Sequence, residues 1–182
     1  MQRRTLLALG LAAPFLASRP ALAQGAPGAR RSIGEMRSDW RSFLPPGTKP
    51  PSPDDAVKLS AAEWKQRLGK EAFEVLREEG TEYAFSSPLD KEKRRGVFVC
   101  AGCDLPLFTS EMKYDSGTGW PSFFTTIPGV FRTREDNKIF YTRIEYHCAR
   151  CGGHHGHVFR DGPPPTRERW CNNGVALRFL PA

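Results

Sequence analysis

Two Cys-x-x-Cys pairs place the strongest constraint on how this chain can fold. Cys100 and Cys103 form one pair, Cys148 and Cys151 form the other, and residues 104–147 separate them. Each pair stands where a β-like run ends and a glycine-bearing turn begins, so two thiolates can converge on one ion. Two such pairs predict a closed tetrahedral Zn²⁺ site with four cysteine ligands. Because the pairs are distant in sequence, this zinc site would join distant strands.

Two disulfide bonds are the alternative for these four cysteines, and an oxidising compartment would permit them. A bridge inside a Cys-x-x-Cys pair closes a very small loop, however, and would add little stability. Zinc is therefore the favoured interpretation.

The fifth cysteine stands alone near the C-terminus, in the segment Arg169-Trp170-Cys171-Asn172-Asn173. Nucleophilic or redox chemistry is the leading explanation for an unpaired cysteine close to arginines. Arg169 would favour the thiolate form of Cys171. The alternative is that Cys171 is a small buried apolar residue.

The N-terminus has the composition of an export signal. Two arginines within the first four residues precede an uncharged apolar stretch over residues 6–17, and an Ala-x-Ala cleavage site ends at Ala23. The stretch is too short to span a bilayer. We predict a signal peptide over residues 1–23, similar to a twin-arginine signal, and a periplasmic location. A short buried helix is the alternative.

Removing this signal leaves a mildly basic chain. The segment carries three arginines and no acids, so the formal net charge falls from +7 to +4. No stripe of Lys and Arg interleaved with aromatic residues follows, so nucleic-acid binding has little support. No later segment is apolar enough to cross a membrane. The remaining length suits one domain with a real core, which we expect to be a monomer.

Composition divides the rest of the chain into an arm and a domain. Residues 24–56 are rich in Gly, Pro, Ser and Arg, which predicts a flexible arm, and residues 57–182 form the expected catalytic domain. A Ser-Ala-Ala-Glu capping box at residues 60–63 predicts a helix start. Gly69 is expected to split the helical region into two short helices, and Gly80 to end the second.

From about residue 96 the apolar pattern alternates with a period of two, which is typical of strands. A Glu-Asp-Asn turn within this region favours a hairpin. The sequence therefore predicts a mainly β domain with antiparallel sheets and short N-terminal helices. The expected strands cover residues 97–99, 130–133, 139–146, 156–160 and 175–179.

Three further motifs occur in order: Gly117-Thr-Gly-Trp-Pro-Ser-Phe123, Cys151-Gly-Gly-His-His-Gly-His-Val-Phe-Arg-Asp-Gly-Pro163 and Arg169-Trp-Cys-Asn-Asn173. Together with the cysteine pairs and residues 77–82, they resemble the B-type peptide methionine-R-sulfoxide reductases (MsrB). The resemblance covers residues 57–182. It implies two antiparallel sheets (the β-tent fold) and a structural zinc ion. It also implies oxidised proteins as substrates and a thioredoxin-like or other thiol as reductant.

Reducing a sulfoxide with a thiol requires a thiolate, a proton donor for the oxygen and an apolar pocket for the methyl group. Cys171 is the candidate nucleophile, and attack on the sulfoxide sulfur would leave a sulfenic acid. His154 and His157 are the natural acids near neutral pH. Trp120 offers a rigid indole face to the methyl group, with Phe159 as a second apolar candidate. The resemblance implies the same roles for Cys171, both histidines and Trp120.

Several of these residues have structural alternatives. Asn173 would share the strand face of Cys171 and hydrogen-bond substrate or thiolate, but a turn role before Gly174 is equally reasonable. His154 and His157 alone would more often be structural than catalytic. Core packing is the alternative for Trp120 and the favoured one for Phe159.

The chain departs from the family pattern at Thr118, where many members carry a second, resolving cysteine. The sequence holds five cysteines, so none is free once zinc takes four and Cys171 acts as nucleophile. We therefore predict that an external thiol reduces the Cys171 sulfenic acid.

Two other functions remain open on the sequence. One is a thiol-disulfide oxidoreductase that uses a Cys-x-x-Cys pair, although the βαβ context of that class is missing. The other is a zinc-stabilised β domain that only binds methionine-rich or oxidised proteins.

Overall fold

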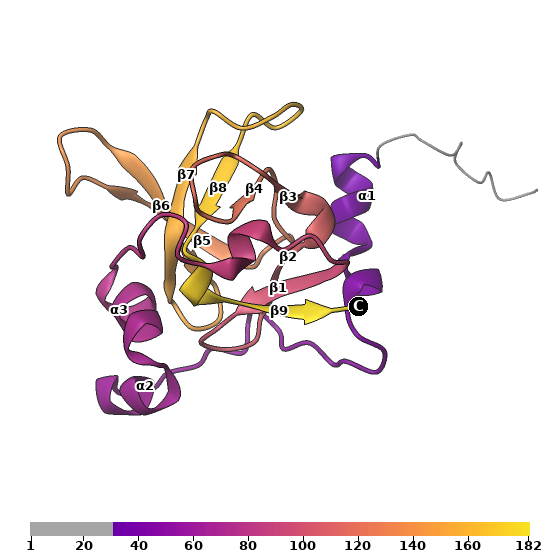
Figure 1. Ribbon diagram of the computed structural model, residues 1–182. Coiled ribbons are helices and arrows are strands. Elements are labelled where there is room, and N and C mark those ends of the chain that lie inside the picture. The colour runs from indigo at the N-terminus through magenta and orange to yellow at the C-terminus, as the bar shows by residue number, and fades with distance from the viewer. Residues whose placement is uncertain (1–30) are drawn as a thin grey trace, which may run out of the picture. The chain divides into compact units, whose positions relative to one another are not determined.

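The computed structural model describes residues 31–182, which form two antiparallel sheets (Figure 1). The predicted signal peptide lies outside the described residues. One sheet has the strand order β2-β1-β9 and the other the order β3-β4-β8-β7-β6-β5, so the mainly β prediction is confirmed. The strands are β1 (Gly96–Cys100), β2 (Pro106–Thr109), β3 (Lys113–Tyr114), β4 (Ser122–Phe123), β5 (Phe131–Asp136), β6 (Arg143–Cys148), β7 (His154–Phe159), β8 (Arg169–Asn172) and β9 (Leu177–Pro181).

Two short helices precede the sheets as expected. The capping box starts α2 (Ala61–Arg67), because the Ser60 amide donates to the Glu63 carboxylate at 2.7 Å and the Glu63 amide donates back to Ser60 Oγ at 3.3 Å. Gly69 is the N-cap of α3 (Lys70–Glu78). Glu79, not Gly80, takes the left-handed position that ends this helix, with φ 59°. Three 3₁₀ helices follow along the chain: η2 (Pro88–Lys91), η3 (Ser110–Met112) and η4 (Gly174–Ala176). In the described part of the chain, no helix has the length and apolar character needed to span a membrane.

Aromatic side chains join the two sheets. Phe108 of β2 stacks on Phe123 of β4 with ring centroids 3.8 Å apart, and Phe98 of β1 meets the same ring edge-on at 5.1 Å. All three side chains are fully buried. Such aromatic pairs add about 0.5–1.5 kcal/mol each beyond the burial of their area. The larger sheet is therefore held against the smaller one close to β4 and its neighbour β8.

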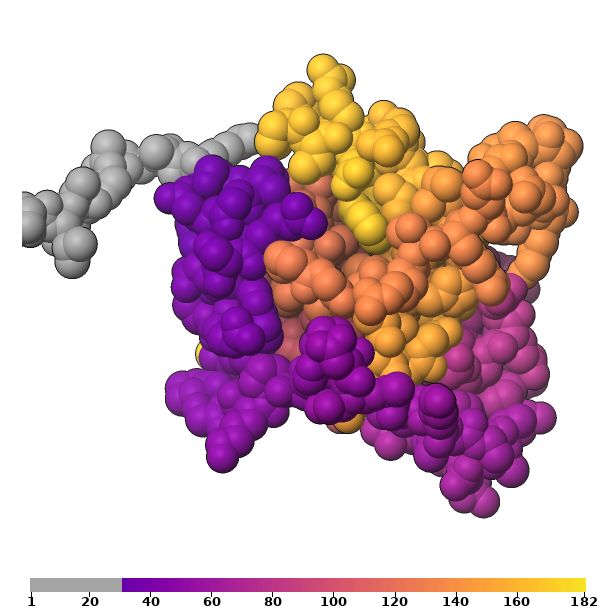
Figure 2. All heavy atoms as spheres, turned by 180° about the vertical axis from the view of Figure 1, so that it is seen from behind, coloured from indigo at the N-terminus to yellow at the C-terminus, as the bar shows by residue number. Residues whose placement is uncertain are grey.

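The segment 31–56 differs from the expected flexible arm. It forms α1 (Ile33–Ser38) and η1 (Trp40–Phe43) and lies against the domain as the indigo to purple surface in Figure 2. Phe43 is 1% exposed and packs with Val97 and Val99 of β1. The arm prediction is thus wrong for these residues, because a few well-spaced apolar side chains outweigh the Pro- and Gly-rich composition.

Candidate active site and metal centre

Four buried cysteines converge at one point, which we name the zinc clip: Cys100, Cys103, Cys148 and Cys151. The sulfurs of Cys100 and Cys151 lie 3.6 Å apart, those of Cys103 and Cys148 lie 3.5 Å apart, and all four lie within 4.8 Å of one another. For Zn–S bonds of about 2.3 Å, a tetrahedron places neighbouring sulfurs about 3.8 Å apart. The donor set therefore fits a four-thiolate zinc ion, as predicted.

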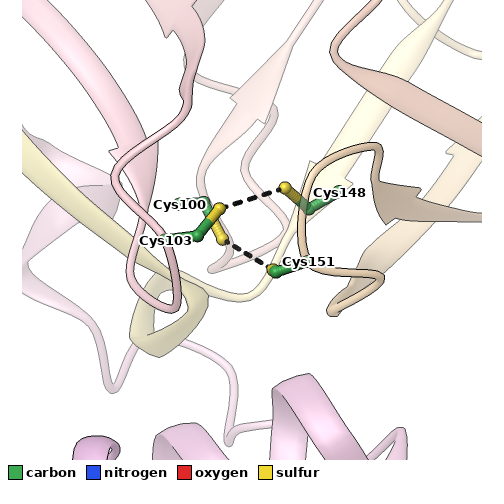
Figure 3. Close-up of side chains that lie close together, drawn as sticks. All are labelled: Cys100, Cys103, Cys148 and Cys151. Carbon is green, nitrogen blue, oxygen red and sulfur yellow. Dashed lines mark hydrogen bonds between the residues drawn. The ribbon is translucent and has the colours of Figure 1, made fainter. Parts of the chain in front are cut away.

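Two tight turns present the cysteines of the zinc clip to each other (Figure 3). In the turn after β1, the Asp104 amide donates to the Cys100 carbonyl at 2.9 Å. In the turn after β6, the Gly152 amide donates to the Cys148 carbonyl at 2.8 Å. Since β1 and β6 belong to different sheets, the zinc clip joins the two sheets, which confirms the prediction of a link between distant strands. The burial of all four thiols gives no support to a redox-active Cys-x-x-Cys pair.

A single row of side chains crosses the larger sheet and contains Cys171. Directly opposite residues in antiparallel strands place their side chains on the same face. Cys171 of β8 pairs with Ser122 on one side and with His157 on the other. The complete row across the six strands is Tyr114, Ser122, Cys171, His157, Glu145 and Arg134. The sheet register alone therefore brings the predicted nucleophile beside a predicted proton donor.

A pocket of about 150 Å³ opens over this row. It is smaller than the roughly 300–1,000 Å³ of pockets that hold drug-sized ligands, so it suits one short side chain. Five predicted site residues line it: Trp120, His157, Phe159, Cys171 and Asn173. Thr81, Arg143, Gly156 and Asn172 complete the lining, whereas the predicted residues His154 and Arg169 are not part of it.

The environment of Cys171 differs from the expected thiolate-stabilising one. Burial raises the pKa of the Cys171 thiol, and this outweighs the opposing effects of the Arg169 charge and the Thr118 hydroxyl. Arg169 donates two hydrogen bonds to Asp161, both at 2.8 Å, and its guanidinium lies 4.2 Å from the centre of the Phe159 ring. The Asp161 carboxylate opposes the effect of the Arg169 charge on the thiol, but more weakly than Arg169 acts. Cys171 is a neutral thiol at pH 7 and needs a base.

His157 is placed to supply that base. Its Nε2 lies 2.8 Å from Asp136 Oδ2, which also accepts a hydrogen bond from Arg143 at 2.6 Å. The Lys138 amide, then His157 and Arg143, hold the pKa of Asp136 well below its ordinary range, so the carboxylate is ionised. Burial lowers the pKa of His157, against the opposing effect of Asp136. The imidazole is therefore neutral at pH 7, with an ionised partner that favours its protonated form.

A β-bulge brings His154 to the same face of the sheet as His157. The strand β7 runs through Gly156 without a turn. Gly156 pairs with Tyr146 of β6, whereas His154 pairs with the next residue of β6, His147. The strand β7 therefore carries one extra residue, His155, at this point. The rings of His154 and His157 consequently stand 5.6 Å apart, while His155 is buried on the other face and bonds to Asn172. Burial lowers the pKa of His154 to about 4.

The Asn173 side chain forms hydrogen bonds with backbone groups around the pocket. The strand β8 ends at Asn172, so the expected alternation does not reach Asn173. Its Oδ1 accepts from the Glu82 amide and its Nδ2 donates to the His155 carbonyl, both at 3.0 Å. The Glu82 carbonyl in turn accepts from Trp120 Nε1 at 3.2 Å. Asn173 therefore positions the Trp120 wall through Glu82, and the bonds of its side chain go to backbone groups, not to the thiolate.

Comparisons with known proteins identify the family of this chain. The family model described as "SelR domain" matches residues 68–181. The peptide methionine sulfoxide reductase MsrB of Methanosarcina barkeri is 50% identical over 125 residues, which cover 68% of this chain and 88% of the relative. The mitochondrial methionine-R-sulfoxide reductase B2 of Rattus norvegicus is 42% identical over 167 residues, which cover 86% and 90%. The chain belongs to the MsrB family.

Three residues of this MsrB chain support the site although the sequence did not predict a role for them: Glu82, Asp136 and Arg143. Glu82 accepts hydrogen bonds from the Gly174 and Val175 amides at 2.5 and 3.0 Å. The sequence feature that could have indicated Glu82 is the motif over residues 77–82. Asp136 and Arg143 flank the loop of the β5–β6 hairpin. Nothing in the local sequence distinguishes them from ordinary hairpin residues, since their function depends on the cross-strand register.

Proposed function

We propose that this MsrB protein reduces methionine-R-sulfoxide residues in oxidised proteins, with Cys171 as the nucleophile. One observation carries the proposal: Cys171 is the single cysteine outside the zinc clip, and it opens into a side-chain-sized pocket. Trp120 and Phe159 line that pocket and supply the apolar surface that a methyl group requires. His157 lines it from the neighbouring strand.

In the first step, His157 acts as base and then as acid. Its Nε2–H donates to the ionised Asp136, which leaves Nδ1 as the proton acceptor for the Cys171 thiol. The thiolate attacks the sulfoxide sulfur, and the imidazolium, stabilised by Asp136, returns the proton to the sulfoxide oxygen. The sulfoxide sulfur gains two electrons and the Cys171 sulfur loses two. The products are methionine and Cys171 sulfenic acid, so the oxygen atom and the proton are both accounted for.

An external thiol completes the cycle. The sulfenic acid and one thiol form a mixed disulfide and water, and a second thiol releases Cys171 as the other sulfurs pair. Thr118 supports this route, because its hydroxyl contacts Cys171 at the place where a resolving cysteine would stand. A thioredoxin-like protein or a small dithiol satisfies the requirement.

The zinc clip has a structural part in this proposal. A bound Zn²⁺ would cross-link the two sheets and would offer no open position, since four thiolates complete its tetrahedron. Residues of the clip hold the turn that leads into β7 and therefore help to fix the strand that carries His157.

Export to the periplasm is a further part of the proposal and rests on the N-terminal composition. N-terminal sequencing of protein from the periplasmic fraction should begin at Gln24. Recovery of the uncleaved chain from the cytoplasm alone would contradict export.

The decisive experiment compares wild type with Cys171→Ser on the two epimers of dabsyl-methionine sulfoxide, with dithiothreitol as reductant. We expect turnover of the R epimer alone in the wild type and none in the variant, with equal zinc content in both proteins. Mass spectrometry after one turnover without reductant should find about 16 Da added at Cys171. Turnover that survives Cys171→Ser would refute the proposed nucleophile.

A further inference from the structure

A second group of metal-binding side chains lies next to the pocket and outside the zinc clip. Glu145 and His147 project from β6, and the bulge in β7 brings His154 beside them. The ligand atoms of these three residues lie within 4.8 Å of one another. Only 2% of the Glu145 side chain, 14% of His147 and 2% of His154 is exposed. We name this group the Glu145 cluster.

The polar atoms of the Glu145 cluster are poorly satisfied. Among residues 31–182, neither ring nitrogen of His154 has a hydrogen-bond partner of good geometry, and the same holds for Glu145 Oε1 and His147 Nε2. Leaving such groups unpaired in a protein interior destabilises the fold. His154 Nδ1 nevertheless contacts Glu145 Oε1, and His147 Nε2 lies 3.1 Å from Glu145 Oε2. The three side chains therefore face one another without completing a hydrogen-bond network.

This arrangement is that of a ligand set for a cation. The outer nitrogen of His147, Nδ1, lies 3.3 Å from the Gly152 carbonyl, and in the tautomer that donates to this carbonyl Nε2 keeps its lone pair for a cation. For metal–ligand bonds of about 2.0–2.1 Å, ligand atoms in a tetrahedron stand about 3.3 Å apart. The 3.1 Å between His147 Nε2 and Glu145 Oε2 is close to this value.

One basic residue competes with a cation at this place. Arg134 donates from Nε to Glu145 Oε2 at 2.8 Å. Its side chain is half-exposed and also pairs with Glu79, so it can leave Glu145 and keep an acidic partner. Arg134 would therefore weaken cation binding without preventing it.

We propose that Glu145, His147 and His154 form a second metal site, which binds a divalent transition metal and inhibits the reductase. Two imidazoles and one carboxylate suit Zn²⁺, Co²⁺, Ni²⁺ or Cu²⁺, and they leave a coordination position for water. A metal there would place a positive charge beside His157, whose ring lies 5.6 Å from that of His154. Such a charge disfavours the imidazolium that the catalytic step needs. The inhibition rests on the proposed function, whereas the metal site does not.

The test uses the full chain with its zinc clip already loaded with Zn²⁺, and Co²⁺ as the probe. We expect one additional Co²⁺ per chain, with a ligand-field spectrum typical of nitrogen and oxygen donors and no sulfur-to-cobalt charge-transfer band. His147→Gln should weaken Co²⁺ binding by more than about 100-fold, since the loss of an outer-shell partner alone costs about 10–100-fold. His157→Asn is the matched control: it removes a neighbouring imidazole of the same strand as His154, and Co²⁺ should still bind.

Arg134→Met provides an independent measurement on an exposed side chain. Removing its guanidinium should make Co²⁺ bind several-fold more tightly. A charge-transfer band from sulfur, or Co²⁺ binding unaffected by His147→Gln, would overturn the site. Co²⁺ should also suppress turnover of the R sulfoxide in the wild type and not in His147→Gln. Undiminished wild-type turnover at full Co²⁺ occupancy would overturn the inhibition, and the spectrum reports on the site even if no turnover is found.

Discussion

The closest backbone approach in the site occurs at Gly156, and Gly156→Ala is expected to disable catalysis more than it destabilises the fold. A Cβ atom at this position would lie 2.0 Å from the Cys171 carbonyl oxygen. Ordinary contacts begin at 3.4 Å, so the two atoms would be 1.4 Å too close. The β7 backbone fixes the position of the Cβ atom, and the oxygen belongs to the backbone of β8. Neither atom can rotate away, so β7 and β8 must move apart.

The size of the effect follows from this displacement. The same two strands carry His157 and Cys171 as direct neighbours, and a misplacement of about 1 Å costs on the order of 100-fold in rate. Overpacking costs about 1–3 kcal/mol of stability. At about 2–4 °C per kcal/mol for a domain of this size, the melting temperature should fall by about 2–12 °C.

Steady-state kinetics with the R sulfoxide and thermal unfolding followed by circular dichroism measure the two effects. Gly34→Ala is the matched control, because Gly34 is exposed inside α1 and the nearest atom to a Cβ added there would be 3.9 Å away. That change should be neutral or stabilise by up to about 1 kcal/mol. If Gly156→Ala keeps wild-type kcat/KM and melting temperature, the two strands do not separate and the reasoning is wrong.

Three further predictions concern the proton, the metal and the missing thiol. The pKa of His157 lies below the ordinary value of about 6.5, so kcat/KM should fall only when the pH drops below about 6.5. Asp136→Asn removes the partner that raises the pKa of His157. This variant should lose activity at a still lower pH than the wild type and should be less active at pH 7. A pH profile unchanged by Asp136→Asn would contradict the base role. Stripping zinc under reducing conditions should lower the melting temperature by about 6–20 °C, as expected for a loss of about 3–5 kcal/mol at about 2–4 °C per kcal/mol; calorimetry on metal-free and reloaded protein checks this, and equal values would remove the structural role of the zinc clip. Thr118→Cys should form a disulfide with Cys171 after one turnover, because Thr118 contacts that thiol; peptide mapping that finds only the sulfenic acid would contradict the placement.

Much of the site follows from the sequence because spaced motifs specify residue types directly. The two Cys-x-x-Cys pairs predicted the zinc clip, and Trp120, His157 and Cys171 line one pocket. What local patterns do not contain is strand register. The link between Asp136 and His157 depends on how β5, β6 and β7 align, and such pairing over long separations leaves no local signal.

The same limitation explains two residues whose surroundings differ from those predicted. Asn173 was placed by strand alternation, but β8 ends one residue earlier and its side chain serves the backbone of Glu82. Arg169 was expected to favour the thiolate, and its charge does lower the pKa of Cys171, but burial of the thiol outweighs this effect and Asp161 binds the guanidinium with two hydrogen bonds. In both cases a distant partner, not the neighbouring residue type, decides what the side chain does.

The β6–β7 pair connects the features that the sequence presents as separate motifs. At one end its turn holds Cys148 and Cys151 of the zinc clip, and the bulge at His154 follows three residues after Cys151. Beyond the bulge, His157 pairs with the strand of Cys171. A shift of the clip turn would therefore move the bulge, and a shift of one residue in the bulge would turn His154 to the opposite face. The zinc clip, though some distance along the chain from Cys171, thus sets the register on which the pairing of base and nucleophile depends.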